Sequence, residues 1–257
     1  MGSIVWGKEI AAVYDTVYAC ESAANEVDAT VEVLADLAGN GPALEFAVGT
    51  GRVALPLSAR GIPVEGIELS PHMAERLRDK REAQAVPLTV GDMTSVRLSK
   101  TFTLVYLVAN TIMNVTTQED QEQVFHNAAV HLEPGGRFVV EVIVPQPHGL
   151  AAGDKGRVFT HDPDHVGIET FDDPVGQIAW SHHWIDVDGR LVKHSAPYRY
   201  VWPAELDLMA KLAGLRLEHR WADWDRAPFS AESSAHVSVY VKQAATAPPG
   251  SAVTRTS

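Results

Sequence analysis

The hydrophobic positions of the chain follow two patterns in turn. Short, nearly continuous apolar runs, typical of strands buried on both faces of a sheet, occupy residues 43–48, 64–69, 87–90, 102–108 and 137–144. Helical spacing is found at residues 52–60, 73–83 and 118–131. Strands that alternate with helices in this way predict an α/β protein with a doubly wound, mostly parallel, Rossmann-like sheet of seven strands.

The pattern changes after Pro145. Short alternating runs follow at residues 157–160, 166–171, 177–186 and 191–202, and Asp188-Gly189 is a strong hairpin signal between the last two. We therefore expect a small antiparallel sheet inserted after the fifth parallel strand. A helix at 204–213 and two strands at 215–221 and 236–242 then complete the larger sheet.

The two ends of the chain differ from this pattern. Residues 8–38 have helical spacing that ends at a Gly-Asn-Gly-Pro turn, whereas residues 244–257 lack core-forming side chains and are expected to be disordered. The sequence thus divides into an N-terminal helical segment (1–40), a Rossmann-like core (41–149), an inserted antiparallel β region (150–202), a closing helix and strand pair (203–243) and a tail (244–257).

The charge of the chain argues against one class of partner. The 257 residues carry a formal net charge of −12, and a surface of that sign repels nucleic acid. No apolar run approaches the ~20 residues that span a bilayer, and no basic-then-apolar signal begins the chain. Because Cys20 is the only cysteine, no internal disulfide can form. We expect a cytoplasmic protein that binds neither nucleic acid nor membrane.

Two glycines follow the first predicted strand. Gly49 and Gly51 fit the dinucleotide fingerprint in its G-x-G-x-x-A form, in which the backbone approaches a pyrophosphate closely. Carboxylates disfavour a diphosphate here, since Glu45 lies on the first strand, Glu68 ends the second and Asp92 follows the third. They suit a ligand with a cationic end and hydroxyl groups. An NAD(P)-dependent oxidoreductase is the alternative on this topology, although no Tyr-x-x-x-Lys pair is present for hydride transfer.

Five segments stand in order over residues 40–145: LEFAVGTGR, VEGIELS, VGDM, FTLVYLVANTIMN and LEPGGRFVVEV. Their order and spacing resemble those of class I S-adenosylmethionine-dependent methyltransferases. The resemblance implies S-adenosylmethionine as the cofactor and methyl transfer as the activity. The sequence departs from the family at two positions, since the family often has glycine where Ala47 stands and aspartate where Glu45 stands.

The resemblance also implies roles for individual residues. The backbone around Ala47, Gly49 and Gly51 would pass under the methionine part of the cofactor. Glu45 would face its ammonium, directly or through water, and Glu68 would accept hydrogen bonds from both ribose hydroxyls. The other residues implied at the cofactor are Asp92 at the adenine amino group, Leu69, Met73 and Met93 on the ring, Asn110 near the methionine end, and Tyr14 on an N-terminal helix that acts as a lid. Core packing is the alternative for Tyr14, Tyr18, Met73 and Met93.

A small molecule is the acceptor that the sequence favours. The motif Asn-Pro-Pro-Tyr, which marks methylation of nucleobase or glutamine amides, is absent after the fourth strand, where ANTIMN stands. The inserted sheet resembles the substrate-covering insertion of some methyltransferases that act on amino sugars and other natural products. Strand alternation puts Trp180, His182 and Trp184 on one face and His183 on the other. The residues expected at the acceptor are Tyr18, Asn114, Trp180 and Trp184; for the tryptophans, the insertion's own core is the alternative.

Methyl transfer is an in-line displacement at a sulfonium, so positioning and desolvation supply much of the acceleration. A base is needed when the acceptor loses a proton, and the candidates are His182, His183 and His194. We expect no metal site, because the proline in His161-Asp-Pro-Asp-His165 prevents a helical pair of ligands. The sequence favours O- or N-methylation but does not decide between oxygen, nitrogen and carbon as the methylated atom. It also leaves open a homodimer and a non-catalytic nucleotide-binding protein on the same scaffold.

Overall fold

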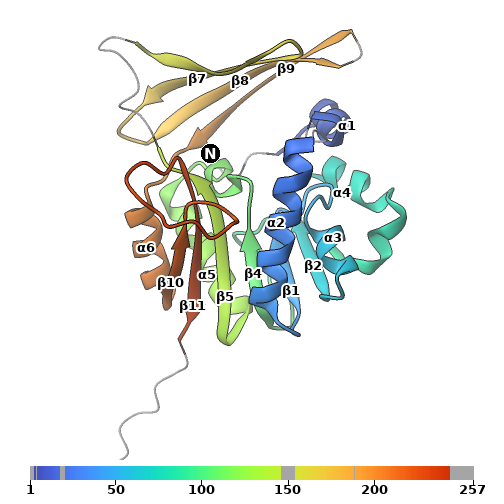
Figure 1. The fold of residues 1–257 in the computed structure, drawn as a ribbon, viewed down its shortest axis with the longest axis vertical. Helices are drawn as coiled ribbons and strands as arrows, with labels where there is room; N and C mark the ends of the chain where they lie inside the picture. Colours follow the sequence, from blue (N-terminus) through green and yellow to red (C-terminus); the bar gives the residue numbers. More distant parts are fainter. Residues whose placement is uncertain (1–2, 4, 18–20, 146–153, 188, 244–257) are drawn as a thin grey trace, which may run out of the picture.

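The larger sheet of the computed structural model has seven strands, in the order β10-β11-β5-β4-β1-β2-β3 (Figure 1). The structure describes residues 3, 5–17, 21–145, 154–187 and 189–243. The parallel strands are β1 (Ala43–Phe46), β2 (Val64–Glu68), β3 (Leu88–Val90), β4 (Phe102–Leu107) and β5 (Leu132–Ile143), and the antiparallel ones are β10 (Leu215–Trp221) and β11 (Ala235–Lys242). The predicted fold class is confirmed.

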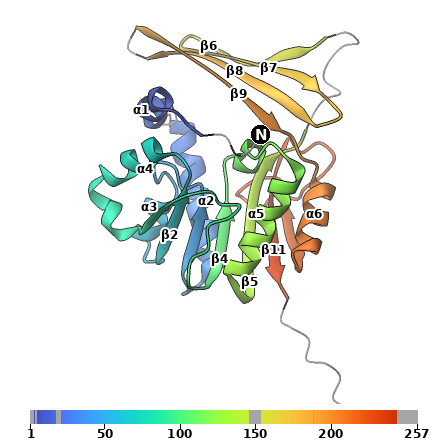
Figure 2. The same cartoon turned by 180° about the vertical axis from the view of Figure 1, so that it is seen from behind.

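Helices cover both faces of this sheet. They are α1 (Lys8–Val17), α2 (Glu21–Ala38), α3 (Ala54–Ala59), α4 (Pro71–Arg78), α5 (Gln118–His131) and α6 (Pro203–Leu212), with single 3-10 turns η1 (Arg81–Ala85) and η2 (Thr111–Asn114). One core layer joins α2 and α3 to the sheet, and the other joins α5 and α6 to its opposite face (Figure 2). Within the described residues, no helix is both long and apolar enough to cross a membrane.

The predicted helical stretch 8–38 contains two helices that run in different directions (Figure 1). The helix predicted at 73–83 ends earlier, at Arg78, and the 3-10 turn η1 follows it. The predicted turn at residues 133–136 is a bulge of β5, since Phe102 pairs with Leu132 but Leu104 pairs with Arg137. Tyr18, Cys20, Asp188 and the tail 244–257 lie outside the described residues.

A second, four-stranded antiparallel sheet lies over the carboxyl edge of the parallel strands (Figures 1 and 2). Its strands are β6 (Gly156–Asp162), β7 (His165–Asp173), β8 (Ile178–Val187) and β9 (Arg190–Arg199). Ala179 of β8 belongs to the protein core, and Phe171 and Tyr198 pack against that core. The face of β8 that carries Ala179, and with it Ser181 and His183, therefore turns toward the larger sheet.

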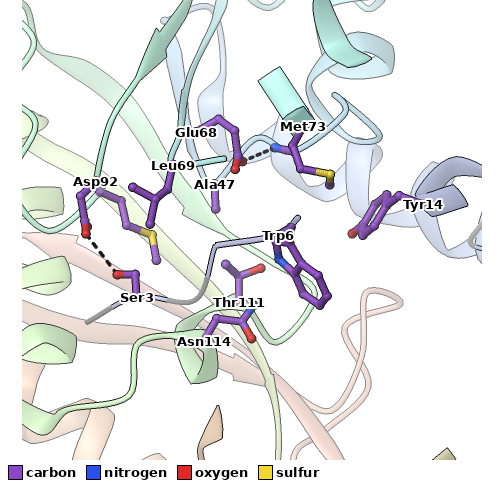
Figure 3. Close-up of a pocket in the computed structure, with 12 residues that line it drawn as sticks. Ser3, Trp6, Tyr14, Ala47, Glu68, Leu69, Met73, Asp92, Thr111 and Asn114 are labelled. Carbon is purple, nitrogen blue, oxygen red and sulfur yellow. Dashed lines mark hydrogen bonds between the residues drawn. The ribbon is translucent and has the colours of Figure 1, made fainter. Parts of the chain in front are cut away.

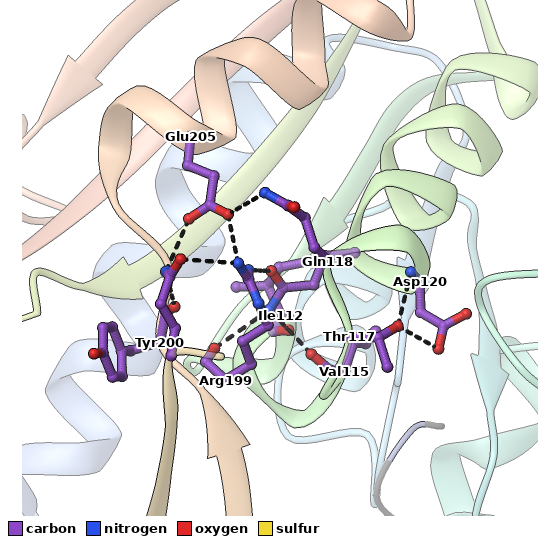
Figure 4. A network of polar contacts seen from close by, with 10 residues as sticks. Ile112, Val115, Thr117, Gln118, Asp120, Arg199, Tyr200 and Glu205 are labelled. Carbon is purple, nitrogen blue, oxygen red and sulfur yellow. Dashed lines mark hydrogen bonds and ion pairs between the residues drawn. The ribbon is translucent and has the colours of Figure 1, made fainter. Parts of the chain in front are cut away.

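A buried polar joint fastens this second sheet to the core at the end of β9 (Figure 4). Arg199 is 4% exposed and donates hydrogen bonds to the side-chain oxygen of Gln121 on α5, at 2.5 Å, and to Glu205 on α6, at 2.6 Å. The Gln121 amide in turn donates to the backbone oxygens of Ile112, Val115 and Arg199. Because a buried cation with satisfied partners tolerates little displacement, the joint holds the inserted sheet in one position above the site.

Candidate functional site

Strained backbone marks the carboxyl edge of the parallel strands. Among the described residues, five non-glycine residues have positive φ, and three of them lie here: Ala47 after β1 (φ 53°) and the consecutive Ala109 and Asn110 after β4 (φ 56° and 61°). Left-handed backbone is costly for residues with a Cβ and tends to persist at functional sites. Gly51 has φ 83°, which residues with a Cβ rarely adopt, and an added Cβ would also lie 2.5 Å from the side chain of Leu77, so the position favours glycine.

A first cavity opens at this edge beneath the N-terminal segment (Figure 3). The strand ends, helix α4 and the N-terminal residues line it together. Its walls contain Ser3, Trp6, Tyr14, Ala47, Gly49, Glu68, Leu69, Met73, Asp92, Met93, Thr111 and Asn114. Eight of the residues expected at the cofactor therefore share one cavity, whereas Glu45, Gly51 and Asn110 are not among its lining residues.

Glu68 is held from two sides by the backbone. Its carboxylate accepts from the N–H of Gly49, at 2.8 Å, and from the N–H of Ser70, at 2.7 Å, one bond on each oxygen. Burial raises the pKa of this carboxyl, and the two N–H donors oppose the shift. A carboxylate has about four acceptor positions, so two remain for donors in the cavity. The geometry fits a ligand with two adjacent hydroxyls.

Asp92 is engaged by the N-terminal segment. One oxygen accepts from the N–H of Thr94 at 2.8 Å, and the other accepts from the hydroxyl of Ser3 at 3.3 Å. The backbone oxygen of Trp6 accepts from the hydroxyl of Ser70 at 2.6 Å, which fixes the segment across the cavity. Ser3 and Trp6 precede the predicted helical stretch at 8–38, and no local pattern marks them as functional. The sequence therefore did not predict these two residues in the cavity wall.

Glu45 does not reach the cavities described here, which corrects the expectation of direct contact with a cofactor. The carboxyl group is 4% exposed and accepts a hydrogen bond of 2.9 Å from the hydroxyl of Tyr106, its register partner on β4. Burial raises the pKa of Glu45 to about 8, although the Tyr106 hydroxyl, Arg52 and the N–H of Ala54 oppose the shift. The Glu45 side chain therefore lies in the core, where it accepts a hydrogen bond from the N–H of Ala54 at the start of α3.

A second cavity adjoins the first and shares Trp6, Tyr14, Thr111 and Asn114 with it. The strained Ala109-Asn110 turn forms one wall. The amide oxygen of Asn110 accepts from the N–H of Ile143 at 2.7 Å, and the N–H of Ala109 donates to Glu141 at 2.7 Å. The charged residues in its walls are Glu26, Arg52 and Glu141, none of which the sequence analysis singled out.

A third cavity lies under the inserted sheet and again includes Trp6 and Tyr14. It is lined on the sheet side by His165, His183, Ile185 and His194. The rings of Trp6 and His194 are 4.9 Å apart, and the ring nitrogens of His165 and His183 are 2.9 Å apart. Burial and the neighbouring histidines lower the pKa of His183 to about 4, and burial lowers that of His194, so both rings are neutral at neutral pH.

His182, Trp180 and Trp184 lie on the opposite face of the inserted sheet, which corrects two expectations. The ring centroids of Trp180 and His182 are 6.3 Å apart with nearly parallel planes, and those of His182 and Trp184 are 6.4 Å apart. The predicted alternation along β8 is thus right, but the face with His183, not the aromatic one, turns toward the cavities. His182 cannot act as a base there, and the two tryptophans cannot hold an acceptor in these cavities.

Comparison with known proteins identifies methyltransferases. A family model described as "Methyltransferase domain" matches residues 43–136. The cypemycin N-terminal methyltransferase of a Streptomyces species is 26% identical over 202 residues, 78% of this chain and 82% of that protein. The structure of the CcbJ methyltransferase from Streptomyces caelestis is 34% identical, with a TM-score of 0.80 over 93% of this chain and 98% of that chain. CalS10, an amino pentose methyltransferase from Micromonospora echinaspora solved with S-adenosylmethionine, shares the fold: its TM-score is 0.68 at 19% identity, over 95% of this chain and 100% of that chain.

The oxidoreductase alternative finds no support in these relatives or in the site. The N–H of Gly49, which a pyrophosphate would need, already donates to the carboxylate of Glu68. A diphosphate placed at this turn would meet that carboxylate at contact distance and be repelled. The N–H of Gly49 is therefore not available to hold a pyrophosphate.

Proposed function

The chain belongs to the class I S-adenosylmethionine-dependent methyltransferases, and on this premise we propose that it methylates an amine nitrogen of a small-molecule acceptor. The acceptor class rests on two relatives whose names specify nitrogen-bearing acceptors, an N-terminal amine and an amino pentose. The observation that carries the proposal is that three adjacent cavities meet at Trp6 and Tyr14. A cofactor and a separate acceptor can then meet at one place.

We assign the adenosine part of the cofactor to the first cavity. Glu68 would accept from the ribose hydroxyls through its remaining lone pairs, and Asp92 would accept from the adenine amino group once the Ser3 hydroxyl moves aside. Leu69, Met73 and Met93 supply apolar walls for the ring. When bound, the cofactor supplies an electrophilic methyl group on a sulfonium.

The methionine part of the cofactor fits the second cavity, beyond Ala47 and the glycine turn. A zwitterionic amino-acid end carries both signs of charge, and the walls of this cavity hold Arg52 for its carboxylate and Glu26 for its ammonium. The left-handed backbone at Ala109 and Asn110 fixes the wall nearest the reacting centre. The role of the chain there is to position the reactants and to exclude water.

The third cavity is the place we propose for the body of the acceptor. Trp6, Tyr14 and Ile185 offer apolar surface, and the neutral His183 and His194 offer hydrogen-bonding groups. Asn114, in the walls of the first two cavities, lies at the passage between them. With a pKa of about 4, His183 is a weak base, so we assign it to acceptor binding rather than to proton removal.

Calorimetric titration with S-adenosylhomocysteine and, separately, with NADH tests the cofactor assignment. We expect binding of S-adenosylhomocysteine and none of NADH. A panel of aliphatic amines, amino sugars and matched alcohols, assayed by release of S-adenosylhomocysteine and mass shift of the acceptor, then tests the acceptor class. Methylation of the alcohols with no methylation of the amines would refute the proposed nitrogen acceptor.

A further inference from the structure

Glu141 is the one acid of β5 that faces both the second cavity and a fourth cavity, behind it. Its two oxygens are held separately: one accepts from the N–H of Ala109 at 2.7 Å and the other from the indole N–H of Trp224 at 2.7 Å. The side chain is half-buried, so it is fixed in place yet open to the cavities. A fixed carboxylate with free lone pairs beside the strained Ala109-Asn110 turn is a receptor for a cation.

The groups facing Glu141 come from several elements. They are Tyr14 of α1, Glu26 of α2 and Arg52 before α3 in the second cavity, and Asp223, Asp225 and His236 in the fourth. Three of these six groups are carboxylic acids and one is an arginine, so the walls favour a cationic group over an anionic one. Burial raises the pKa of the Glu141 carboxyl, and Glu26 adds to that shift, while Arg52 and the two N–H donors oppose it.

We propose that Glu141 binds the ammonium group of the acceptor and takes its proton before methyl transfer. The inference rests on the proposed function, because it needs an amine as the acceptor. An aliphatic amine is protonated at neutral pH and has no lone pair for attack until a proton leaves. A carboxylate whose affinity for protons is above that of an exposed glutamate serves this role better than His183 of the third cavity, whose pKa is lowered to about 4.

The atoms and electrons of this step balance. The acceptor enters as R–NH3+, and one proton passes to an oxygen of Glu141. The nitrogen lone pair then forms the N–CH3 bond, while the S–CH3 bond breaks and its electron pair passes to sulfur. The product leaves as R–NH2CH3+ with S-adenosylhomocysteine, and the proton on Glu141 goes to solvent.

A probe that carries its own amine tests the ammonium site without a known acceptor. In sinefungin, a carbon that bears an ammonium group replaces the methylated sulfur, whereas S-adenosylhomocysteine has an uncharged sulfur there. We expect the wild-type protein to prefer sinefungin, and we expect Glu141→Gln to reduce that preference about tenfold while binding S-adenosylhomocysteine as before. The preference in the wild-type protein should fall as acidification protonates Glu141.

Trp224→Phe is the matched control, since it removes one N–H donor from Glu141 and keeps the carboxylate. This variant should retain the preference for sinefungin, but acidification should abolish it at a higher pH, because that donor lowers the pKa of Glu141. Equal losses of sinefungin and S-adenosylhomocysteine binding in Glu141→Gln would overturn the inference, since they would mean that Glu141 only holds the Ala109 turn. Failure of the wild-type protein to bind S-adenosylhomocysteine would instead overturn the proposed function.

The proton transfer can be tested separately by measuring the rate of methyl transfer in a single turnover at several pH values. The substrate is the amine that the acceptor panel identifies. Glu141→Gln should slow methyl transfer most at neutral pH. The defect should shrink as the pH rises toward the pKa of the acceptor, because the amine then arrives unprotonated. A defect that is constant across pH would overturn the role of Glu141 in proton removal.

Discussion

Replacing Glu45 by glutamine tests whether this side chain has a structural role in the core or contacts the cofactor. The amide is nearly isosteric with the protonated carboxyl, and its oxygen can accept the hydrogen bond from Tyr106. The NH2 group cannot accept the hydrogen bond from the N–H of Ala54, so at low pH, where Glu45 is protonated in both the folded and the unfolded states, the variant should be less stable than wild type by about 1 kcal/mol, the usual net value of one hydrogen bond.

The difference should change sign as the pH rises. The folded-state pKa of Glu45 is raised from 4.5 to about 8, so the unfolded chain ionises first and the wild-type protein loses stability above pH 4.5. At 1.36 kcal/mol per pKa unit, the loss approaches about 3 kcal/mol at pH 7 and about 5 kcal/mol above pH 8. Glutamine does not titrate, so Glu45→Gln should become the more stable protein at neutral pH.

Urea denaturation of both proteins at several pH values between 4 and 9 measures this difference in the free energy of unfolding. Titration with S-adenosylhomocysteine should meanwhile give the same affinity for both proteins, since Glu45 lies outside the cavities described. A stability difference that is independent of pH would refute the argument from burial. A large loss of affinity at unchanged stability would mean that Glu45 contacts the cofactor after all.

Three further substitutions test the site and its support. Glu68→Ala should weaken S-adenosylhomocysteine binding by about 1.5–3 kcal/mol if this carboxylate holds the ribose, as calorimetry would measure; an unchanged affinity would place it outside the site. Ala47→Gly should raise the free energy of unfolding by up to about 1 kcal/mol, because relief of the left-handed backbone exceeds the entropic cost of glycine; a lower urea midpoint would contradict this. Arg199→Leu should cost about 3 kcal/mol by leaving Glu205 and Gln121 without their buried cation, and it should expose the inserted sheet to limited proteolysis; unaltered cleavage would show that the joint is dispensable.

Local patterns predicted which strand ends line the first cavity, except at Glu45. Gly49 and Gly51 lie at a turn with positive φ, as the spacing of glycines after an apolar run predicts. Glu68 and Asp92 line one cavity because the carboxyl ends of parallel strands meet at the same edge of the sheet. The departure at Ala47, where the family often has glycine, has a cost that the sequence does not reveal, since the backbone there is left-handed.

Local sequence patterns could not predict the contacts between segments that are distant in the sequence. Ser3 meets Asp92 across 89 positions of sequence, and Trp6 lies among three cavities only because the N-terminal segment folds back over the sheet edge. Alternation correctly separated His182 from His183, but which face turns toward the core depends on the packing of Ala179 against the larger sheet. A strand pattern specifies two faces and leaves their surroundings to the tertiary fold.

Hydrogen-bond partners and cavity access separate three acids that look alike in the sequence. Glu45, Glu68 and Glu141 each lie on a strand near the same sheet edge, yet their partners differ. Glu45 faces a tyrosine and the start of a helix within the core, which favours its neutral form. Glu68 and Glu141 each accept hydrogen bonds from two N–H groups, and each lines a cavity. Of these three acids, only the last two combine fixed geometry with a place in a cavity wall, so they are the two to which we assign a ligand, hydroxyls for Glu68 and a cationic nitrogen for Glu141.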